Sequence, residues 1–276
     1  MPPDLPPAPV SLVVTDLDGT LWHTDDHLAT TVVDAFRDVQ ARGVPLLVAT
    51  GRRLGSTRRP LRAHGLAAPT VVLNGALGVH QGSDERFHCS PYPTPEAQQV
   101  LAAFASVGLE PVVYVDHPEW EVVLGPSPST HPEHALALGP AAGRLEPELA
   151  VEQLTVLGFG LIGIEHGDAV AARDAIGDVA ETHLDRSLDH PGLVSLTVAP
   201  LGRSKWDGVL AYCAAHGFDP DRVLALGDGP NDVELLDGAA VSLVPEGSHP
   251  AALDRADHVI PPAKEGGWAS VLAHLT

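Results

Sequence analysis

Apolar runs and helical patterns alternate over the first seventy-odd residues of the chain. Short apolar runs predict buried strands, and the segments between them carry apolar residues at helical spacing, such as Val32, Phe36 and Val39. In order, the predicted elements are a strand at 10–15, a helix at 28–41, a strand at 44–49, a helix at 55–64 and a strand at 70–73. Strands and helices that alternate with short links predict a parallel sheet with right-handed crossovers.

The same alternation returns near the C-terminus, whereas the middle of the chain differs. The predicted C-terminal elements are helices at 204–216, 231–236 and 268–274, with strands at 223–226, 240–244 and 258–260. The middle predicts a helix at 94–107, a hairpin at 111–115 and 121–124, a Pro- and His-rich loop at 125–140, a β-like stretch at 154–165, a helix at 168–179 and a strand at 193–198. We therefore expect an α/β protein with a Rossmann-like parallel-sheet core, formed by 1–80 and 201–276, and an inserted α+β domain at 81–200.

Composition and charge narrow the possible functions. The chain has 276 residues, 44% hydrophobic, and no apolar run approaches the roughly 18 residues needed to span a bilayer, so we expect no membrane insertion. A net charge of −20 argues against nucleic-acid binding, which requires a basic surface. Cys89 and Cys213 are the only cysteines, which is typical of reduced thiols in a cytoplasmic protein. Only two of the 16 arginines and lysines, Lys205 and Lys264, are lysines. In a chain that otherwise uses arginine, a lysine indicates a position that requires an ammonium group.

Carboxylates follow two of the predicted strands. Asp16 and Asp18 come directly after the first strand, and Asp228 and Asp232 follow the strand at 223–226. The carboxyl ends of the strands form the edge where ligands bind in open α/β sheets. Carboxylates crowded there repel one another unless a cation neutralises them, and a site rich in hard oxygen ligands suits Mg²⁺.

Groups able to hold a phosphate occur between these two acidic segments. Thr50, Gly51 and Arg52 open a loop after the second strand, where a hydroxyl and a glycine amide can cradle an anion. Lys205 stands at the start of a predicted helix, where a positive charge opposes the helix dipole, so its placement favours a functional role. Taken alone, each segment also fits an ordinary turn or helix cap.

Together, the segments resemble those of the haloacid dehalogenase-like (HAD) hydrolase superfamily, and most closely its Cof-type sugar-phosphate phosphatases. The similarity rests on 16–21, 50–52, Asn74-Gly75-Ala76, Lys205 and 227–232, in this order. An insert after the third strand occupies the place where this subgroup carries an α/β cap domain.

The resemblance implies a mechanism and a role for each residue. Asp16 would attack phosphorus and form an aspartyl-phosphate, while Asp18 would serve as general acid and base. The implied Mg²⁺ ligands are Asp16, the backbone carbonyl of Asp18, and Asp228, with Asp232 holding a metal-bound water or orienting Lys205. The implied phosphate-binding residues are Thr50, Gly51, Arg52, Lys205 and Asn231. The expected substrate is a small phosphorylated metabolite.

Two other functions remain open on the same scaffold. A non-catalytic sensor would bind phosphorylated ligands without turnover, and a phosphomutase would transfer the phosphoryl group to a second position on a sugar. The pattern names neither the physiological substrate nor the oligomeric state. His117, His131 and His134 lie in Pro-rich surroundings, for which we expect a solvated loop rather than a metal site.

Overall fold

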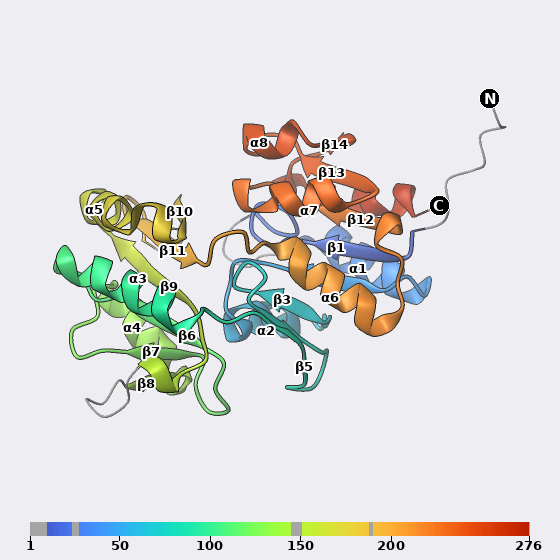
Figure 1. Ribbon diagram of the computed structural model, residues 1–276. Helices are drawn as coiled ribbons and strands as arrows, with labels where there is room; N and C mark the ends of the chain where they lie inside the picture. Colours follow the sequence, from blue (N-terminus) through green and yellow to red (C-terminus); the bar gives the residue numbers. More distant parts are fainter. Residues whose placement is uncertain (1–9, 24–27, 145–150, 188–189, 276) are drawn as a thin grey trace. The chain divides into compact units, whose positions relative to one another are not determined.

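The structure, a computed structural model, describes residues 10–23, 28–144, 151–187 and 190–275. The chain forms two compact units. The first unit comprises the residues up to Arg52, Ser56–His88 and the residues from Ser204 onward, and the second comprises Arg53–Gly55 and Cys89–Arg203. In Figure 1 the blue-to-teal and the orange-to-red segments make up the first unit, and the green-to-yellow segment makes up most of the second.

An eight-stranded sheet forms the centre of the first unit. Its order is β14-β13-β12-β1-β2-β3-β4-β5, and all neighbours from β14 to β3 are parallel, while β4 runs antiparallel to β3. The strands are β1 (Leu12–Thr15), β2 (Leu46–Ala49), β3 (Thr70–Val72), β4 (Leu77–Val79), β5 (Arg86–Cys89), β12 (Val223–Leu226), β13 (Val241–Pro245) and β14 (His258–Ile260). Strands from the two ends of the chain thus meet where β1 pairs with β12.

Helices cover both faces of this sheet. Along β1, Val13 packs into one apolar cluster, and Leu12 and Val14 pack into another, because successive side chains of a strand point to opposite faces. The first cluster includes residues of α1 (Thr30–Ala41), α2 (Leu54–Ala63) and the 3₁₀ helix η7 (Gly267–His274). The second includes residues of α6 (Lys205–His216), α7 (Val233–Gly238) and α8 (Pro250–Leu253). Burial on both faces explains why the central strands β1, β2 and β12 consist almost wholly of apolar residues.

A six-stranded sheet forms the second unit. Its order is β10-β11-β9-β6-β7-β8, antiparallel except for the β7–β8 pair. The strands are β6 (Val112–Val115), β7 (Val122–Leu124), β8 (Ala142–Arg144), β9 (Val156–Ile164), β10 (Glu181–Arg186) and β11 (Val194–Ala199). Helices α3 (Thr94–Ser106) and α5 (His166–Ile176) pack their apolar side chains against β6, β9 and β11.

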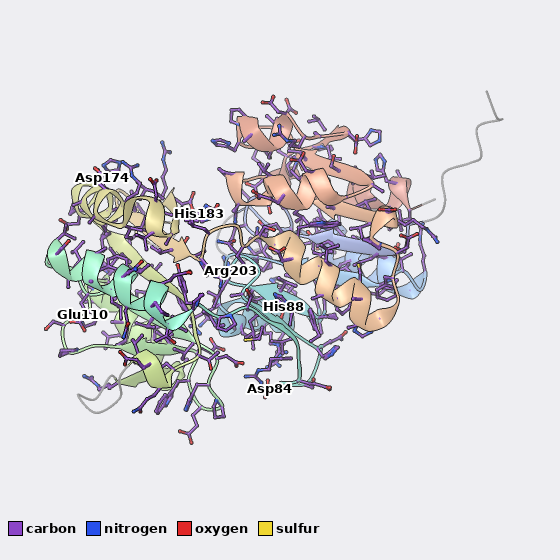
Figure 2. All side chains as sticks on the ribbon, viewed as in Figure 1. Asp84, His88, Glu110, Asp174, His183 and Arg203 are labelled. Carbon is purple, nitrogen blue, oxygen red and sulfur yellow. The ribbon has the colours of Figure 1, made fainter. Side chains whose placement is uncertain are left out.

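A buried arginine joins the two ends of the inserted segment. Arg203, labelled in Figure 2, follows β11 and is only 7% exposed. Its guanidinium donates to the carbonyl oxygens of Ser90 (2.8 Å) and Leu157 (2.7 Å). Because Ser90 lies at the start of the insert and Arg203 at its end, these hydrogen bonds close the second unit.

The structure confirms the predicted fold class, a parallel-sheet α/β core with an inserted α+β region. The loop predicted at 125–140 is wrong in part, since it contains helix α4 (Pro132–Leu138) followed by the 3₁₀ turn η1 (Gly139–Ala141). Proline is compatible with the first turn of a helix, where its missing N–H costs nothing, and the Ala and Leu residues after Glu133 are good helix formers.

Several elements were not predicted. Strands β4, β5, β8 and β10 are short or carry many polar residues, so their apolar pattern is weak. The terminal helix predicted at 268–274 is present as the 3₁₀ helix η7. Within the described residues, none of the helices combines the length and apolar character that crossing a bilayer would take.

Candidate active site

Four adjacent parallel strands bring the predicted site residues to one edge of the core sheet. Asp16 follows β1, Thr50 follows β2, Asn74 follows β3, and Asp228 follows β12. The strands lie side by side in the order β12-β1-β2-β3 and run in the same direction, so their carboxyl ends share an edge. This is the position at which open α/β sheets bind their ligands.

Lys205 lies at the centre of the site and is completely buried. Its Nζ donates hydrogen bonds to Asp16 Oδ1 at 2.8 Å and to Asp232 Oδ1 at 2.7 Å. Lys205 is the first residue of α6, and the start of this helix is fixed by Ser204, whose N–H donates to Asp207 Oδ2 at 2.8 Å. The helix start therefore aims the ammonium group at two carboxylates from distant parts of the chain.

Asp232 holds both the lysine and the turn that carries Asp228. Its Oδ2 atom accepts hydrogen bonds from the N–H groups of Asp228 (3.0 Å) and Gly229 (2.9 Å), while Oδ1 contacts Lys205. The side chain is fully buried. Both of its oxygens are thus engaged within the protein, which makes Asp232 an orienting residue for its neighbours.

Asp228 is positioned by the first acidic segment. Thr20 Oγ1 donates to Asp228 Oδ1 at 3.0 Å, and Thr20 is itself fully buried. Gly19 adopts φ +78°, and a Cβ atom there would lie 2.1 Å from Asp228 Oδ2. Only glycine therefore allows the loop after β1 to approach Asp228 this closely. The sequence did not predict that Thr20 orients Asp228. Its position directly after Asp18 and Gly19 could have suggested a role in the site.

The three carboxylates share a site with a single ammonium group. Burial raises the pKa of Asp16 well above its usual range, against the opposing effect of Lys205, and the nearby Asp232 and Asp228 add to the rise. Burial, followed by the charge of Asp232, raises the pKa of Asp228 to about 7. Burial opposes the charged form of Lys205, but Asp16 and Asp232 raise its pKa above the usual value. The site is therefore short of positive charge.

A divalent cation fits this donor set. Asp16, Asp228 and Asp232 each offer a carboxylate oxygen, and the three atoms lie within 4.8 Å of one another. Hard oxygen ligands of this kind suit Mg²⁺, and a cation would relieve the repulsion that raises the pKa of Asp16 and of Asp228. The side chain of Asp18 is not part of this cluster.

The side chain of Asp18 is held by a fork of donors. Arg52 donates from Nε to Asp18 Oδ2 at 2.6 Å and from Nη2 to Oδ1 at 2.5 Å. Trp22 Nε1 also donates to Oδ1, at 2.9 Å, and the Arg52 guanidinium lies 5.2 Å from the centre of the Trp22 ring. Arg52, which the sequence places among the phosphate-binding residues, is thus paired with the predicted general acid in this structure.

The remaining predicted residues gather around Asn74. Asn231 Nδ2 donates to Asn74 Oδ1 at 3.1 Å, and the Oδ1 atom lies 3.1 Å from where a Cβ on Gly51 would stand. Thr50 is buried, and its Oγ1 accepts from the Arg52 N–H at 3.2 Å. Asn74 supported the family resemblance but received no role from the sequence. The sequence feature that could have identified Asn74 is the Asn-Gly turn directly after a strand. Asn74 adopts φ +50°, which suits such a turn.

The sequence matches a family model and several known proteins. A sequence model described as haloacid dehalogenase-like hydrolase matches residues 13–121 and 171–272. The chain is 26% identical over 272 residues to a phosphoglycolate phosphatase of Methanopyrus kandleri, covering 96% of this chain and 97% of the relative. It is 23% identical to a pyridoxal phosphate phosphatase of Escherichia coli, covering 90% and 92% of the two chains.

Solved structures share the fold. A HAD-superfamily phosphatase from Bacteroides thetaiotaomicron matches with a TM-score of 0.77 at 19% identity, covering 100% of this chain and 99% of that one. A haloacid dehalogenase-like hydrolase from Bacillus subtilis matches with a TM-score of 0.77 at 17% identity, covering 96% and 100%. The names of the sequence relatives confirm the predicted enzyme class, a phosphatase of the HAD type. Because the matched segments span most of the sequence and include every residue of the site around Lys205, the chain belongs to the haloacid dehalogenase-like hydrolase family.

Proposed function

We propose that the protein is a Mg²⁺-dependent phosphatase that hydrolyses small phosphomonoesters through an aspartyl-phosphate on Asp16. The observation that carries this proposal is the buried ammonium of Lys205 between Asp16 and Asp232, with Asp228 completing a group of three carboxylates. A lysine held against one carboxylate of an acidic cluster lowers the repulsion that an incoming phosphate dianion would meet there. A pure binding site has no need of a carboxylate in this position.

In the first step, an Asp16 oxygen forms a bond to phosphorus while the bond from phosphorus to the alcohol oxygen breaks. Asp18 donates a proton to the departing alkoxide, for which it exchanges its contact with Arg52 for one with the leaving group. In the second step, water attacks the aspartyl-phosphate, Asp18 takes a proton from that water, and Asp16 is released with inorganic phosphate.

Other residues bind and orient the phosphoryl group. Thr50, the Gly51 amide and Asn231 lie at the same edge of the sheet as Asp16, and Lys205 supplies a fixed positive charge. Asp16 and Asp228, together with the backbone carbonyl of Asp18, are the residues that would hold Mg²⁺, with Asp232 supporting it. When bound, the ion would neutralise charge between the carboxylates and the substrate phosphate.

The substrate class and the role of the second unit are part of the proposal. Three relatives are named as phosphatases of phosphoglycolate, of pyridoxal phosphate and of 5-amino-6-(5-phospho-D-ribitylamino)uracil, each a small phosphomonoester. We therefore assign sugar phosphates or related metabolites to this chain, with the inserted domain acting as a cap that excludes water and selects among them. The cytoplasmic location expected from the sequence is part of the same proposal.

The test is phosphate release from a panel of small phosphomonoesters, with Mg²⁺ and with EDTA. Asp16→Asn should abolish release and leave the fold intact, because the amide is a poor nucleophile of nearly the same shape. Asp34→Asn, an exposed aspartate of α1, is the matched control and should retain activity. Turnover by Asp16→Asn would overturn the proposal. Binding of phosphorylated ligands by the native chain without any release would instead favour the sensor function.

A further inference from the structure

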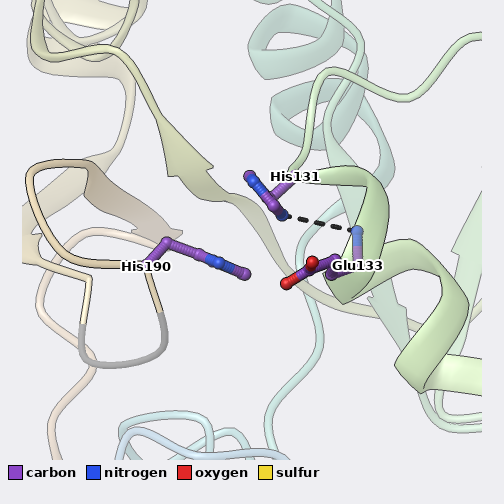
Figure 3. A group of neighbouring side chains, drawn as sticks. All are labelled: His131, Glu133 and His190. Carbon is purple, nitrogen blue, oxygen red and sulfur yellow. Dashed lines mark hydrogen bonds between the residues drawn. The ribbon is translucent and has the colours of Figure 1, made fainter.

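Two histidines and a glutamate meet in the second unit, where His190 joins His131 and Glu133 from a distant part of the sequence. His131, Glu133 and His190 each offer one ligand atom, and these atoms all lie within 4.8 Å of one another. Figure 3 shows the His190 ring and the Glu133 carboxylate pointing toward each other, with His131 beside them. The centroids of the two imidazole rings are 3.7 Å apart. The sequence predicts a solvated loop around His131, so this cluster is a product of the tertiary structure.

Backbone hydrogen bonds fix the segments that carry both histidines. The His131 N–H donates to the Ile162 carbonyl of β9 at 2.8 Å, and the Thr130 hydroxyl bonds both the carbonyl and the N–H of Ile162. On the other side, the Leu193 N–H donates to the His190 carbonyl at 3.1 Å, just before β11 begins. Since β9 and β11 are paired, the two histidines are anchored to neighbouring strands.

A bulge at Gly163 makes room for the two rings. The register of the β9–β11 pairing shifts at this point. Val194 lies opposite Ile164, and the next residue, Ser195, lies opposite Ile162, so the pairing skips Gly163. Gly163 adopts φ +67°, and a Cβ atom at this position would lie 2.4 Å from His190 Cδ2 and 2.9 Å from His131 Cβ. β-Bulges recur where a strand must redirect a side chain, and this one brings two imidazoles into contact.

The chemistry of the three groups points to a transition metal. Neutral imidazole and carboxylate are the ligands that Zn²⁺ accepts, whereas Mg²⁺ prefers sites built wholly of oxygen. His131 Nδ1 accepts a long hydrogen bond of 3.4 Å from the Glu133 N–H, a weak contact that a metal bond can replace. Glu133 is exposed and both histidines are partly exposed, so an ion has access from solvent. His131 also lines an open cleft of about 460 Å³, together with Thr130, Glu165 and Asp168.

We propose that His131, Glu133 and His190 bind one divalent metal ion such as Zn²⁺, through two imidazole nitrogens and one carboxylate oxygen. Bonds of about 2.0–2.2 Å require the ligand atoms to draw together from their present spacing. Glu133 is exposed and unconfined by the core, so rotation of its side chain supplies most of this movement. With three protein ligands, a fourth position stays open for water or a small anion. The ion also fastens the loop before β11 to the start of α4.

The test is calorimetric titration of the full chain with Zn²⁺ in the presence of excess Mg²⁺, which occupies the carboxylate site around Asp16. We expect one equivalent of Zn²⁺ to bind. His190→Ala and Glu133→Gln should each weaken this binding at least tenfold, while His117→Ala should leave it unchanged. His117 is the matched control, because it belongs to the same unit and stacks on Trp120 instead of joining the cluster.

Cobalt provides a second measurement. Co²⁺ bound to the cluster in low coordination should give visible absorption that His190→Ala removes and Asp228→Asn preserves, which separates this site from the carboxylate site. Circular dichroism of each variant establishes that it is folded. Absence of Zn²⁺ binding to the native chain would overturn the proposal. So would unchanged affinity in folded His190→Ala and Glu133→Gln.

Discussion

Replacing Lys205 by methionine tests how the charges of the active site are balanced. The ammonium of Lys205 is fully buried and contacts Asp16 and Asp232 at 2.8 Å and 2.7 Å. Methionine keeps most of the side-chain length and removes the charge, so the surrounding carboxylates lose the ammonium group that they contact. Removing one partner of a buried ion pair typically costs about 3–5 kcal/mol, because the remaining charge is left without compensation. We expect a loss of folding free energy of this size in EDTA, together with loss of phosphatase activity.

Urea-induced unfolding in EDTA, followed by tryptophan fluorescence, provides the assay. Three of the four tryptophans, Trp22, Trp206 and Trp268, lie in the first unit, so the signal reports mainly on the unit that contains the site. Lys264→Met is the matched control, since Lys264 is the only other lysine and is exposed. Its effect should stay within about 0.5 kcal/mol.

A double substitution separates charge from packing. Asp232→Asn in the Lys205→Met background removes one of the uncompensated carboxylates, so the double variant should be more stable than Lys205→Met alone. The loss caused by Lys205→Met should also be larger at pH 8 than at pH 5. Asp16 and Asp228 have raised pKa values in the folded chain, so at low pH they hold protons that relieve the repulsion. Lys205→Met with native stability, or a double variant no more stable than the single one, would refute this reasoning.

Two further predictions concern Asp228. One follows from its charge, and the other from the close approach of Gly19 to its side chain. Asp228 has a pKa of about 7 in the folded chain against 3.8 for the isolated group, so its ionisation costs stability as the pH rises through 7. Asp228→Asn should therefore raise the free energy of unfolding in EDTA at pH 8 by at most about 4 kcal/mol, at 1.36 kcal/mol per pKa unit, which appears as a higher urea midpoint. It should also abolish stabilisation by Mg²⁺. A lower midpoint would contradict the prediction. Gly19→Ala should remove activity and Mg²⁺ stabilisation, because its Cβ would collide with Asp228 and its φ is unfavourable for alanine. Native kinetics in Gly19→Ala would show that this approach is unnecessary.

Local patterns were sufficient to predict most of the core. The apolar runs of β1, β2, β3 and β12 are short and sharply bounded, because a strand buried on both faces is apolar at nearly every position. The acidic segments directly follow such runs, so their common location at the sheet edge could be predicted from the direction of parallel strands. The same reasoning failed for α4, since the Pro- and His-rich composition of 125–140 concealed a short helix.

The sequence by itself determined which chemical groups follow which strands, and only the tertiary structure decided which of them touch. Lys205 and Asp16 are 189 residues apart in the sequence. They come into contact because β1 pairs with β12 and α6 packs against the same sheet. The tertiary structure likewise brings Arg52 to Asp18 and His131 to His190, although the two residues of each pair are far apart in the sequence. Hydrophobic periodicity is a property of neighbouring residues, whereas these contacts depend on strand order, register and a single bulge, which no local pattern encodes.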